Sequence, residues 1–212
     1  MAAVMKTFGF LNKCPKRGVI IDSSEPDQIG EYKTLKPEFG NQHYEFEEEI
    51  DPAFPEPLMK EIQATIFVDS NHGHDKVIEK YINGMIGLLG STLVSWSAKR
   101  QSSAMTVTFG VEFISLKKAV EKVIVYRYHC RVFGKRVSKP TIMHEDNMAV
   151  FVNSAEPGSM LQHECTSLSC HFCRENCADE VVQIRHVKSK SNLADGVTKG
   201  LDSSDFNNFS CH

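Results

Sequence analysis

The sequence predicts an α/β fold in which helices pack on both faces of a mixed five-stranded sheet. Short apolar runs rich in β-branched residues recur from residue 62 onward, and one long stretch with helical spacing interrupts them. Two of the runs flank a glycine turn, which predicts an antiparallel hairpin. The resulting order is β-β-β-α-β-α-β-α, and this order favours a mixed sheet with helices on its faces.

The five expected strands follow from local patterns. Residues 62–69 (IQATIFVD) form a β-branched run that is expected to end at Asp69. The second and third strands, 84–91 and 92–99, meet at Gly90–Ser91. Residues 140–146 (PTIMHED) predict a fourth strand that delivers Asp146, and EVVQIRHV predicts the last.

The expected helices occupy the intervals between these strands. The spacing of apolar residues predicts a helix over 105–132, and Gly134 is a plausible stop. A short helix follows through residues 149–153 before the PGS breaker at 157–159. Further helices are predicted over residues 160–177 and from Asn192 to Lys199.

The chain divides into three predicted parts. Residues 1–20 predict a short helix, and residues 21–60 form an acidic connector that contains prolines. Residues 61–205 carry the regular pattern and form the predicted domain. A length of 212 residues suits one domain with an appendage.

Composition limits the classes of function. The net charge is −3, so a nucleic-acid partner would require a local basic surface. No apolar run approaches the roughly 18 residues that a membrane span needs, and no secretory signal is evident. Because seven cysteines are an odd number, they cannot all pair within one chain. Free thiols in a reducing compartment, cytoplasmic or nuclear, are therefore expected.

Four acidic residues carry the strongest chemical signal: Asp69, Glu112, Asp146 and Asp195. Two of them follow predicted strands, Glu112 lies within the long predicted helix, and Asp195 opens the last one. Carboxylates gathered at the mouth of a sheet can hold two divalent cations that clamp a phosphodiester. Mg²⁺ suits such a site because it prefers oxygen ligands, and Mn²⁺ is an alternative.

The motifs around these residues resemble the ribonuclease H domain of copia-type retrotransposon polyproteins. The similarity runs from about Thr65 to Leu201 and includes FVDSNHGHD, GSTLVSWSAKRQ, VEFISLKKAVEKVI, HEDNMAV, CHFCRE and NLADGVTKGL in that order. The first 20 residues are also similar to the last helix of the reverse transcriptase part of such polyproteins.

This resemblance implies a ribonuclease H-like fold and a metal-dependent cut in the RNA strand of an RNA–DNA hybrid. It implies that Asp69, Glu112, Asp146 and Asp195 hold two Mg²⁺ ions. The carboxylates of Asp69, Glu112 and Asp146 are expected to converge, with Asp195 at the edge of the group. The implied partners are the hybrid and the reverse transcriptase region, with no membrane partner. Lys99, Arg100 and Asn147 are expected to contact nucleic acid.

Three further features have ordinary structural roles as alternatives to functional ones. Trp96 is expected to pack in the core rather than to stack on a base. His72 and His74 follow Asp69 closely and could assist proton transfer, although a solvated loop is the more common role for such a pair. Lys117, Lys118 and residues 131–139 are expected to be solvated faces that could add to an electrostatic track.

Two other functions remain open from the sequence. The chain could be a decayed copy that acts only as a folded binding scaffold, because fold does not guarantee function. It could also contain a zinc-binding module, because His163, Cys165, Cys170, His171, Cys173 and Cys177 lie close together. The spacing of these cysteines does not form two clean C-x2-C pairs, so half-exposed or buried thiols on one helix are expected instead.

Overall fold

The computed structural model describes residues 21–22, 24, 33–34, 50–58, 60–72, 81–100, 108–155 and 164–198. The predicted helix over residues 1–20 lies outside these residues, as do residues 199–205 at the end of the predicted domain.

The described residues form a six-stranded sheet with the order β1-β6-β5-β2-β3-β4. Its strands are β1 (Lys33–Thr34), β2 (Ala64–His72), β3 (Tyr81–Leu89), β4 (Thr92–Arg100), β5 (Thr141–Glu145) and β6 (Val182–His186). All five predicted strands are present. The sixth, β1, comes from the predicted connector and pairs antiparallel with β6 at the edge of the sheet.

The sheet is mixed, as the order of elements predicts. β2, β3 and β4 are antiparallel neighbours, whereas β5 is parallel to both β2 and β6. The β3–β4 turn lies at Gly90 and Ser91, and Gly90 has a φ of 59°. This left-handed conformation suits glycine, which explains why the hairpin is visible in the sequence.

The boundaries where β2 meets β3 were predicted wrongly. β2 does not end at Asp69 but continues to His72, and β3 begins at Tyr81 rather than Gly84, because the two strands pair over this stretch. Asp69 therefore lies inside a strand, opposite Gly84.

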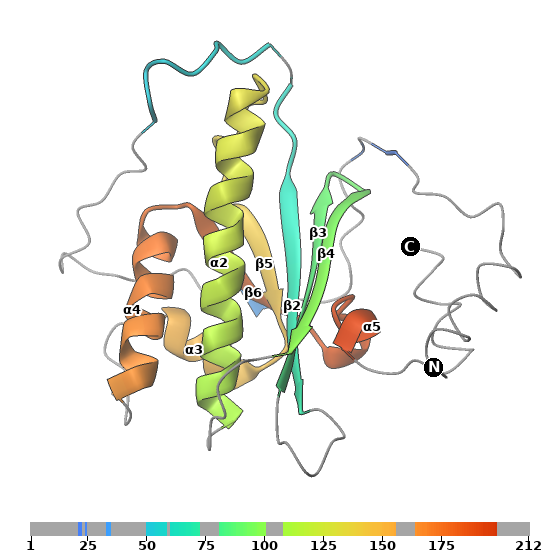
Figure 1. Ribbon diagram of the computed structural model, residues 1–212, viewed down its shortest axis with the longest axis vertical. Coiled ribbons are helices and arrows are strands. Elements are labelled where there is room, and N and C mark those ends of the chain that lie inside the picture. The colour runs from blue at the N-terminus through green and yellow to red at the C-terminus, as the bar shows by residue number, and fades with distance from the viewer. Residues whose placement is uncertain are drawn as a thin grey trace, which may run out of the picture.

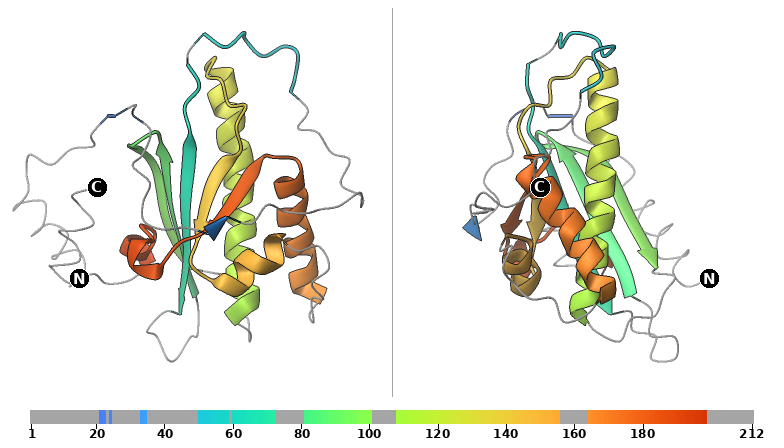
Figure 2. Two further views of the ribbon diagram at one scale, coloured as in Figure 1. Left: turned by 180° about the vertical axis from the view of Figure 1, so that it is seen from behind. Right: turned by 90° about the vertical axis from the view of Figure 1, so that its left-hand side faces the viewer.

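The helices cover the two faces of the sheet unequally. They are α2 (Thr108–Val132), α3 (Met148–Ala155), α4 (Glu164–Ala178) and α5 (Asp195–Thr198), with a short 3-10 helix over Ser189–Ser191. α2, α3 and α4 pack on one face, and α5 packs against the opposite face near β2 and β3 (Figures 1 and 2).

The C-terminal end of α2 is followed by the predicted glycine stop, Gly134. Gly134 has a φ of 65°, and the N–H of Lys135 donates to the carbonyl of Cys130 at 2.8 Å. Residues of the predicted connector contact this end: the Leu58 N–H donates to the Gly134 carbonyl at 3.0 Å, and the Phe54 ring lies edge-on to Tyr128.

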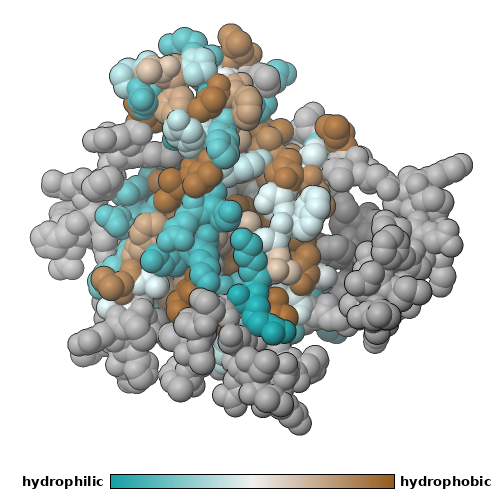
Figure 3. All heavy atoms as spheres, in the orientation of Figure 1, coloured by the Kyte–Doolittle hydropathy of each residue, from teal (hydrophilic) through white to brown (hydrophobic). Residues whose placement is uncertain are grey.

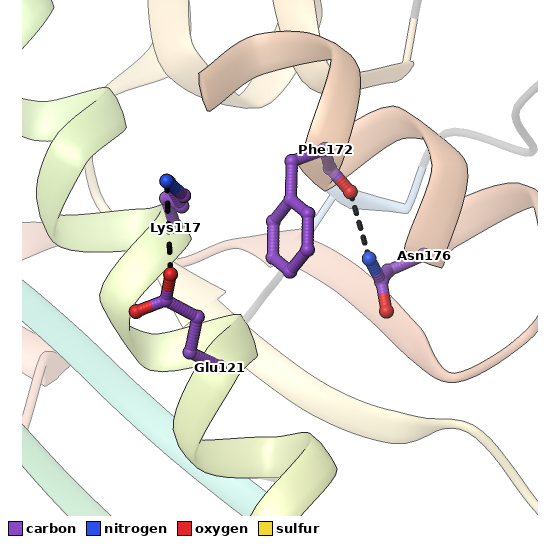
Figure 4. A network of polar contacts seen from close by, with 4 residues as sticks. All are labelled: Lys117, Glu121, Phe172 and Asn176. Carbon is purple, nitrogen blue, oxygen red and sulfur yellow. Dashed lines mark hydrogen bonds and ion pairs between the residues drawn. The ribbon is translucent and has the colours of Figure 1, made fainter. Parts of the chain in front are cut away.

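α2 and α4 lie side by side over the sheet, and Figure 4 shows a polar part of their contact. Lys117 Nζ is 3.7 Å from Glu121 Oε1 on the same helix and 5.7 Å from the centre of the Phe172 ring on α4. Asn176 Nδ2 donates to the Phe172 carbonyl at 2.8 Å.

Each face of the sheet has its own apolar core. The core under α2 includes Val68, Phe113, Leu116, Met143 and Phe151, all nearly fully buried. The core under α5 is smaller and consists of Phe67, Ile86, Leu88 and Ala194, with partly buried neighbours.

The prediction that Trp96 packs in a core is wrong. Its side chain is 63% exposed on β4, the strand at the end of the described sheet. The edge position explains the error, because a strand pattern does not reveal whether a helix covers the strand.

Hydrophilic side chains lie over the middle of α2 on the face drawn in Figure 3, as expected for an amphipathic helix.

None of the helices that the structure describes combines the length and the apolar character that a membrane span requires.

Candidate metal centre

Strand register brings Asp69 and Asp146 together. β2 and β5 are parallel, and Phe67 pairs with His144. Asp69 and Asp146 each follow these residues by two positions, so they extend the same side of neighbouring strands. Neighbouring strands are about 4.8 Å apart, which places the two carboxylates next to each other.

The sequence after β5 also fixes Asp146. The chain leaves the strand after Glu145 and enters α3 at Met148. Asn147 caps this helix: its Oδ1 accepts the N–H groups of Ala149 at 3.0 Å and Val150 at 3.3 Å. A hydrogen bond of 3.1 Å joins His186 Nε2 to the backbone carbonyl of Asp146.

α5 adds Asp195 from the other face of the sheet. One ligand oxygen from each of Asp69, Asp146 and Asp195 lies within 4.8 Å of the other two. Among the described residues, this is the group of side chains that could hold a metal ion.

Glu112 borders this group from the second turn of α2. It is only 8% exposed, and its pKa is raised from 4.5 to about 7. Burial is the main cause, and the negative charges of Asp69 and Asp146 raise the pKa further. Ser70 and Asn147 act in the opposite direction. Glu112 is therefore close enough to feel both aspartates, although it is not one of the three residues within 4.8 Å.

This arrangement differs from the expected one in one respect. The sequence suggested that Glu112 would complete the tight group and that Asp195 would stand at its edge. In the structure Asp195 belongs to the tight group, and Glu112 lies beside it. The close packing of α5 against β3 explains the position of Asp195, and no local pattern predicts that packing.

Glu145 is a fifth acidic residue of this region, and sequence reasoning missed it. Its side chain is fully buried. Oε1 accepts the Asn147 N–H at 3.2 Å, and Oε2 has no hydrogen-bond partner. Burial, followed by the charges of Glu112 and Asp146, raises its pKa well above the ordinary value. Strand alternation was the available signal, because Glu145 follows the buried Met143 by two positions.

His144 does not supply a compensating positive charge. Its ring stacks on Phe67, with 4.6 Å between ring centres. Burial, helped by the charge of Arg185, lowers its pKa to about 4. His144 is therefore neutral near pH 7 and does not offset the negative charge of the carboxylates.

The donor set fits a hard divalent cation. Three carboxylates converge and a fourth borders them, so the available ligand atoms are oxygens. Mg²⁺ prefers such ligands and retains waters for a substrate phosphate. Like-charged groups at this spacing also repel one another, and a bound cation would relieve that repulsion.

The residues expected to contact nucleic acid lie near this centre. Lys99 and Arg100 are exposed at the end of β4. Lys99 pairs with Asn83, which in turn pairs with Ser70, the neighbour of Asp69. Two strand spacings separate Lys99 from Ser70, or about 10 Å. Asn147 is half-buried as the cap of α3.

The three cysteines of α4 whose side chains the structure describes are buried, as expected. The thiols of Cys170, Cys173 and Cys177 belong to the core under α2 and are free. Burial raises their pKa values, to about 11 for Cys170 and about 12 for Cys177. Zinc binds thiolates, so these side chains do not favour the zinc alternative. His163, His74 and the side chains of Cys165 and His72 lie outside the described residues.

The strand order and helix placement define a ribonuclease H-like fold. The structure aligns with the N-terminal RNase H domain of a Mycobacterium tuberculosis protein, solved as a fusion with maltose-binding protein, with a TM-score of 0.50. The alignment covers 69% of this chain and 98% of that domain, at 10% identity. At this identity, the likeness concerns the fold.

The chain is also similar in sequence to two retrotransposon polyproteins. The chain is 25% identical over 146 residues to the Retrovirus-related Pol polyprotein from transposon RE1 of Arabidopsis thaliana, across 68% of this chain and 10% of that protein. It is 28% identical over 131 residues to the corresponding polyprotein from transposon RE2 of the same plant, across 60% of this chain and 9% of that protein. No protein-family model matches.

These relatives confirm the predicted resemblance to copia-type polyproteins, and an RNase H domain of such a polyprotein fits the chain. The chain spans about a tenth of the length of the curated relatives it matches.

Proposed function

We propose that this chain is a metal-dependent nuclease of the ribonuclease H type, which cleaves the RNA strand of RNA–DNA hybrids. The convergence of Asp69, Asp146 and Asp195 within 4.8 Å carries this proposal. The resemblance of the chain to the ribonuclease H domain of retrotransposon polyproteins supports it, because this resemblance implies cleavage of such hybrids.

Asp69, Asp146, Asp195 and Glu112 would hold two Mg²⁺ ions. Asp69 lies in β2, the strand between β5 and β3, so its carboxylate would be the most central ligand. Ions held there would supply Lewis-acid chemistry, namely activation of a water molecule for in-line attack on phosphorus and stabilisation of the leaving 3′ oxygen. The protein would contribute the fixed positions of the four carboxylates: Asp69 on β2, Glu112 on α2, Asp146 directly after β5, and Asp195 on α5.

Lys99 and Arg100 would guide the substrate to this centre. They lie about two strand spacings from the β2 residue beside Asp69, close enough for a contact to a phosphate near the scissile one. No base-reading motif is needed, because hybrid duplexes are recognised by shape and by 2′-hydroxyl groups. The partner region would be the reverse transcriptase part of the same polyprotein.

Cleavage of a hybrid with a labelled RNA strand tests this function. Asp69→Asn retains the size of the side chain and removes its charge. We expect wild-type protein to cut with Mg²⁺ and not with EDTA, and Asp69→Asn to lose at least 100-fold in rate, which corresponds to about 3 kcal/mol of barrier. Asp51→Asn is the matched control, because the same change is made at an exposed residue outside the site.

The competing proposal is a folded binding scaffold without activity. If the wild-type chain folds by circular dichroism and binds the hybrid but never cuts it, even with the reverse transcriptase region supplied, the scaffold replaces the nuclease. If Asp69→Asn cuts as fast as wild type, the centre has been assigned to the wrong residues.

A further inference from the structure

Thr198 connects the last helix to the central aspartate. It is the final residue of α5 and is 8% exposed. Its Oγ1 donates a hydrogen bond to Asp69 Oδ2. The residue that supplies this bond thus lies three positions after Asp195, on the same short helix.

Two asparagines hold the same helix against β2. Asn192 Nδ2 donates to the Val68 carbonyl at 2.8 Å, and Asn192 Oδ1 accepts the Ala194 N–H at 3.1 Å. Asn71 Nδ2 donates to the Thr198 carbonyl at 3.4 Å. Asp69 is therefore flanked on its own strand by two attachments of α5, one on each side along the chain.

Gly84 makes this close approach feasible. It pairs with Asp69 across the sheet, and a side chain here would overlap the methyl group of Thr198. The same added carbon would lie 3.0 Å from Val197 and 3.1 Å from the Ala194 carbonyl. α5 therefore occupies the space above Gly84, with the hydroxyl of Thr198 directed to Asp69.

The bond to Asp69 does more than satisfy a buried hydroxyl. Thr198 Oγ1 also lies 3.3 Å from the Ala194 carbonyl and 3.4 Å from the Asp195 carbonyl, so α5 itself offers acceptors. The carboxylate, by contrast, needs an external partner to fix its rotation, because the terminal torsion of aspartate is broad. The bond to Oδ2 favours one rotation of the Asp69 carboxylate.

We propose that Thr198 is a positioning residue: it orients the Asp69 carboxylate and ties that orientation to the place of Asp195. This inference rests on the proposed function, since it takes both aspartates as metal ligands. Partners that orient metal ligands typically contribute about 10- to 100-fold to metal affinity or activity. The hydroxyl of Thr198 would thus act on cation binding itself, before any substrate is present.

Two substitutions separate the hydroxyl from the methyl group. Thr198→Val retains the shape against Gly84 and removes the donor, whereas Thr198→Ser retains the donor and removes the methyl group. We expect Thr198→Val to weaken binding of Mn²⁺ to the metal-free chain by about 10-fold or more, measured by the signal of free Mn²⁺ in electron paramagnetic resonance. Thr198→Ser should restore most of the affinity.

Thr65→Val is the matched control. Thr65 lies on the same strand, is 2% exposed, and has a hydroxyl with no hydrogen-bond partner. It precedes Asp69 by four residues, or about 13 Å along a strand. We expect this variant to bind Mn²⁺ as wild type does.

Melting temperatures with and without Mg²⁺ provide the second measurement. A positioning role predicts that Thr198→Val loses most of the rise in melting temperature caused by Mg²⁺. A purely structural role predicts an equal fall with and without Mg²⁺ and an unchanged affinity for Mn²⁺, and this result would overturn the inference alone. A wild-type chain that binds neither cation would overturn the proposed function and the inference together. If Thr198→Val does not fold, two other variants test the inference. Thr198→Ser retains the donor, and Asn71→Ala removes a bond to the Thr198 carbonyl. Weak Mn²⁺ binding by Thr198→Ser together with undiminished binding by Asn71→Ala would overturn the inference.

Discussion

The two faces of the sheet are built in different ways. Seventeen of the described residues form the buried core under α2, α3 and α4, whereas four form the buried core under α5. α2 alone spans 25 residues, and α5 spans four. Burial of apolar side chains therefore attaches α2, α3 and α4 to the first face. Hydrogen bonds and the close contact with Gly84 provide much of the attachment of α5 to the second face.

This contrast places the site at the weaker face. Asp69 lies in the central strand β2, Asp146 directly follows β5 and Glu112 lies in the long helix, but Asp195 depends on α5. Regions with few buried apolar contacts open locally at a lower free energy than the core. We infer that the metal centre is lost by displacement of α5 while the rest of the domain stays folded.

The largest expected effect comes from the strong face. Phe113 is fully buried under α2, and Phe113→Ala should lower the free energy of unfolding by about 3–5 kcal/mol. Val197 on α5 is half-buried, and Val197→Ala should cost about 1 kcal/mol. Urea unfolding followed by circular dichroism measures both values.

Amide hydrogen exchange can measure the stability of the two faces separately. Val197→Ala should speed exchange in residues 195–198 and leave the central strands protected. If both variants instead destabilise the whole chain to the same extent, the two faces are one cooperative unit and the contrast is wrong.

The next effect has the opposite sign. Glu112→Gln should stabilise the metal-free protein above pH 7. The pKa of Glu112 is raised from 4.5 to about 7, so between these two pH values the folded state binds a proton that the unfolded state has lost. Above pH 7 the folded state must bury the charged carboxylate. The contribution of Glu112 to stability is most favourable below pH 4.5 and falls as the pH rises to 7. A pKa difference of this size corresponds to on the order of 3 kcal/mol.

Melting temperatures of both proteins from pH 4 to pH 9 measure this effect. The advantage of Glu112→Gln should grow from pH 4.5 to pH 7 and stay constant above. Added Mg²⁺ should raise the melting temperature of wild type more than that of the variant. A Glu112→Gln variant less stable than wild type at pH 8 without metal would contradict the burial of a charged carboxylate there.

The strong face was also the more predictable one. The spacing of Val111, Val120 and Val123 predicted α2, and Gly134 predicted its end, because burial of one helix face leaves a periodic pattern. The β3–β4 hairpin was equally visible from its glycine turn. Trp96 was placed wrongly because β4 is an edge strand, and β-strand patterns do not report which face a helix covers.

The weaker face was harder to predict for a physical reason. Residues that join α5 to β2, such as Asn192 and Thr198, form contacts across more than 120 positions of the sequence. No local periodicity encodes such contacts. Motif resemblance supplied the identities of Asp69, Glu112, Asp146 and Asp195, but the distances among them depend on this packing. Glu145 was missed because the adjacent Asp146 matched the motif.

The smallest expected effect on stability tests the fit between α5 and β3. In Gly84→Ala the new methyl group would overlap Thr198 and crowd the backbone of Ala194, so α5 must shift. We expect a loss of about 1–3 kcal/mol from crowding, offset by the roughly 0.5–1 kcal/mol gained when alanine replaces glycine in a strand. The net loss should therefore be about 0–2.5 kcal/mol, below that expected for Phe113→Ala, while Mg²⁺ binding weakens markedly because Asp195 moves with α5.

Gly87→Ala is the matched control on the same strand. Its added carbon would meet Ser95 at 3.4 Å, an ordinary contact, and the position is remote from α5. We expect this variant to match or exceed wild type in stability and to bind Mg²⁺ normally in a calorimetric titration. If Gly84→Ala binds Mg²⁺ as well as Gly87→Ala does, then α5 tolerates displacement from β3 without moving Asp195. In that case the metal centre depends on the central strands alone, and the weaker face does not limit it.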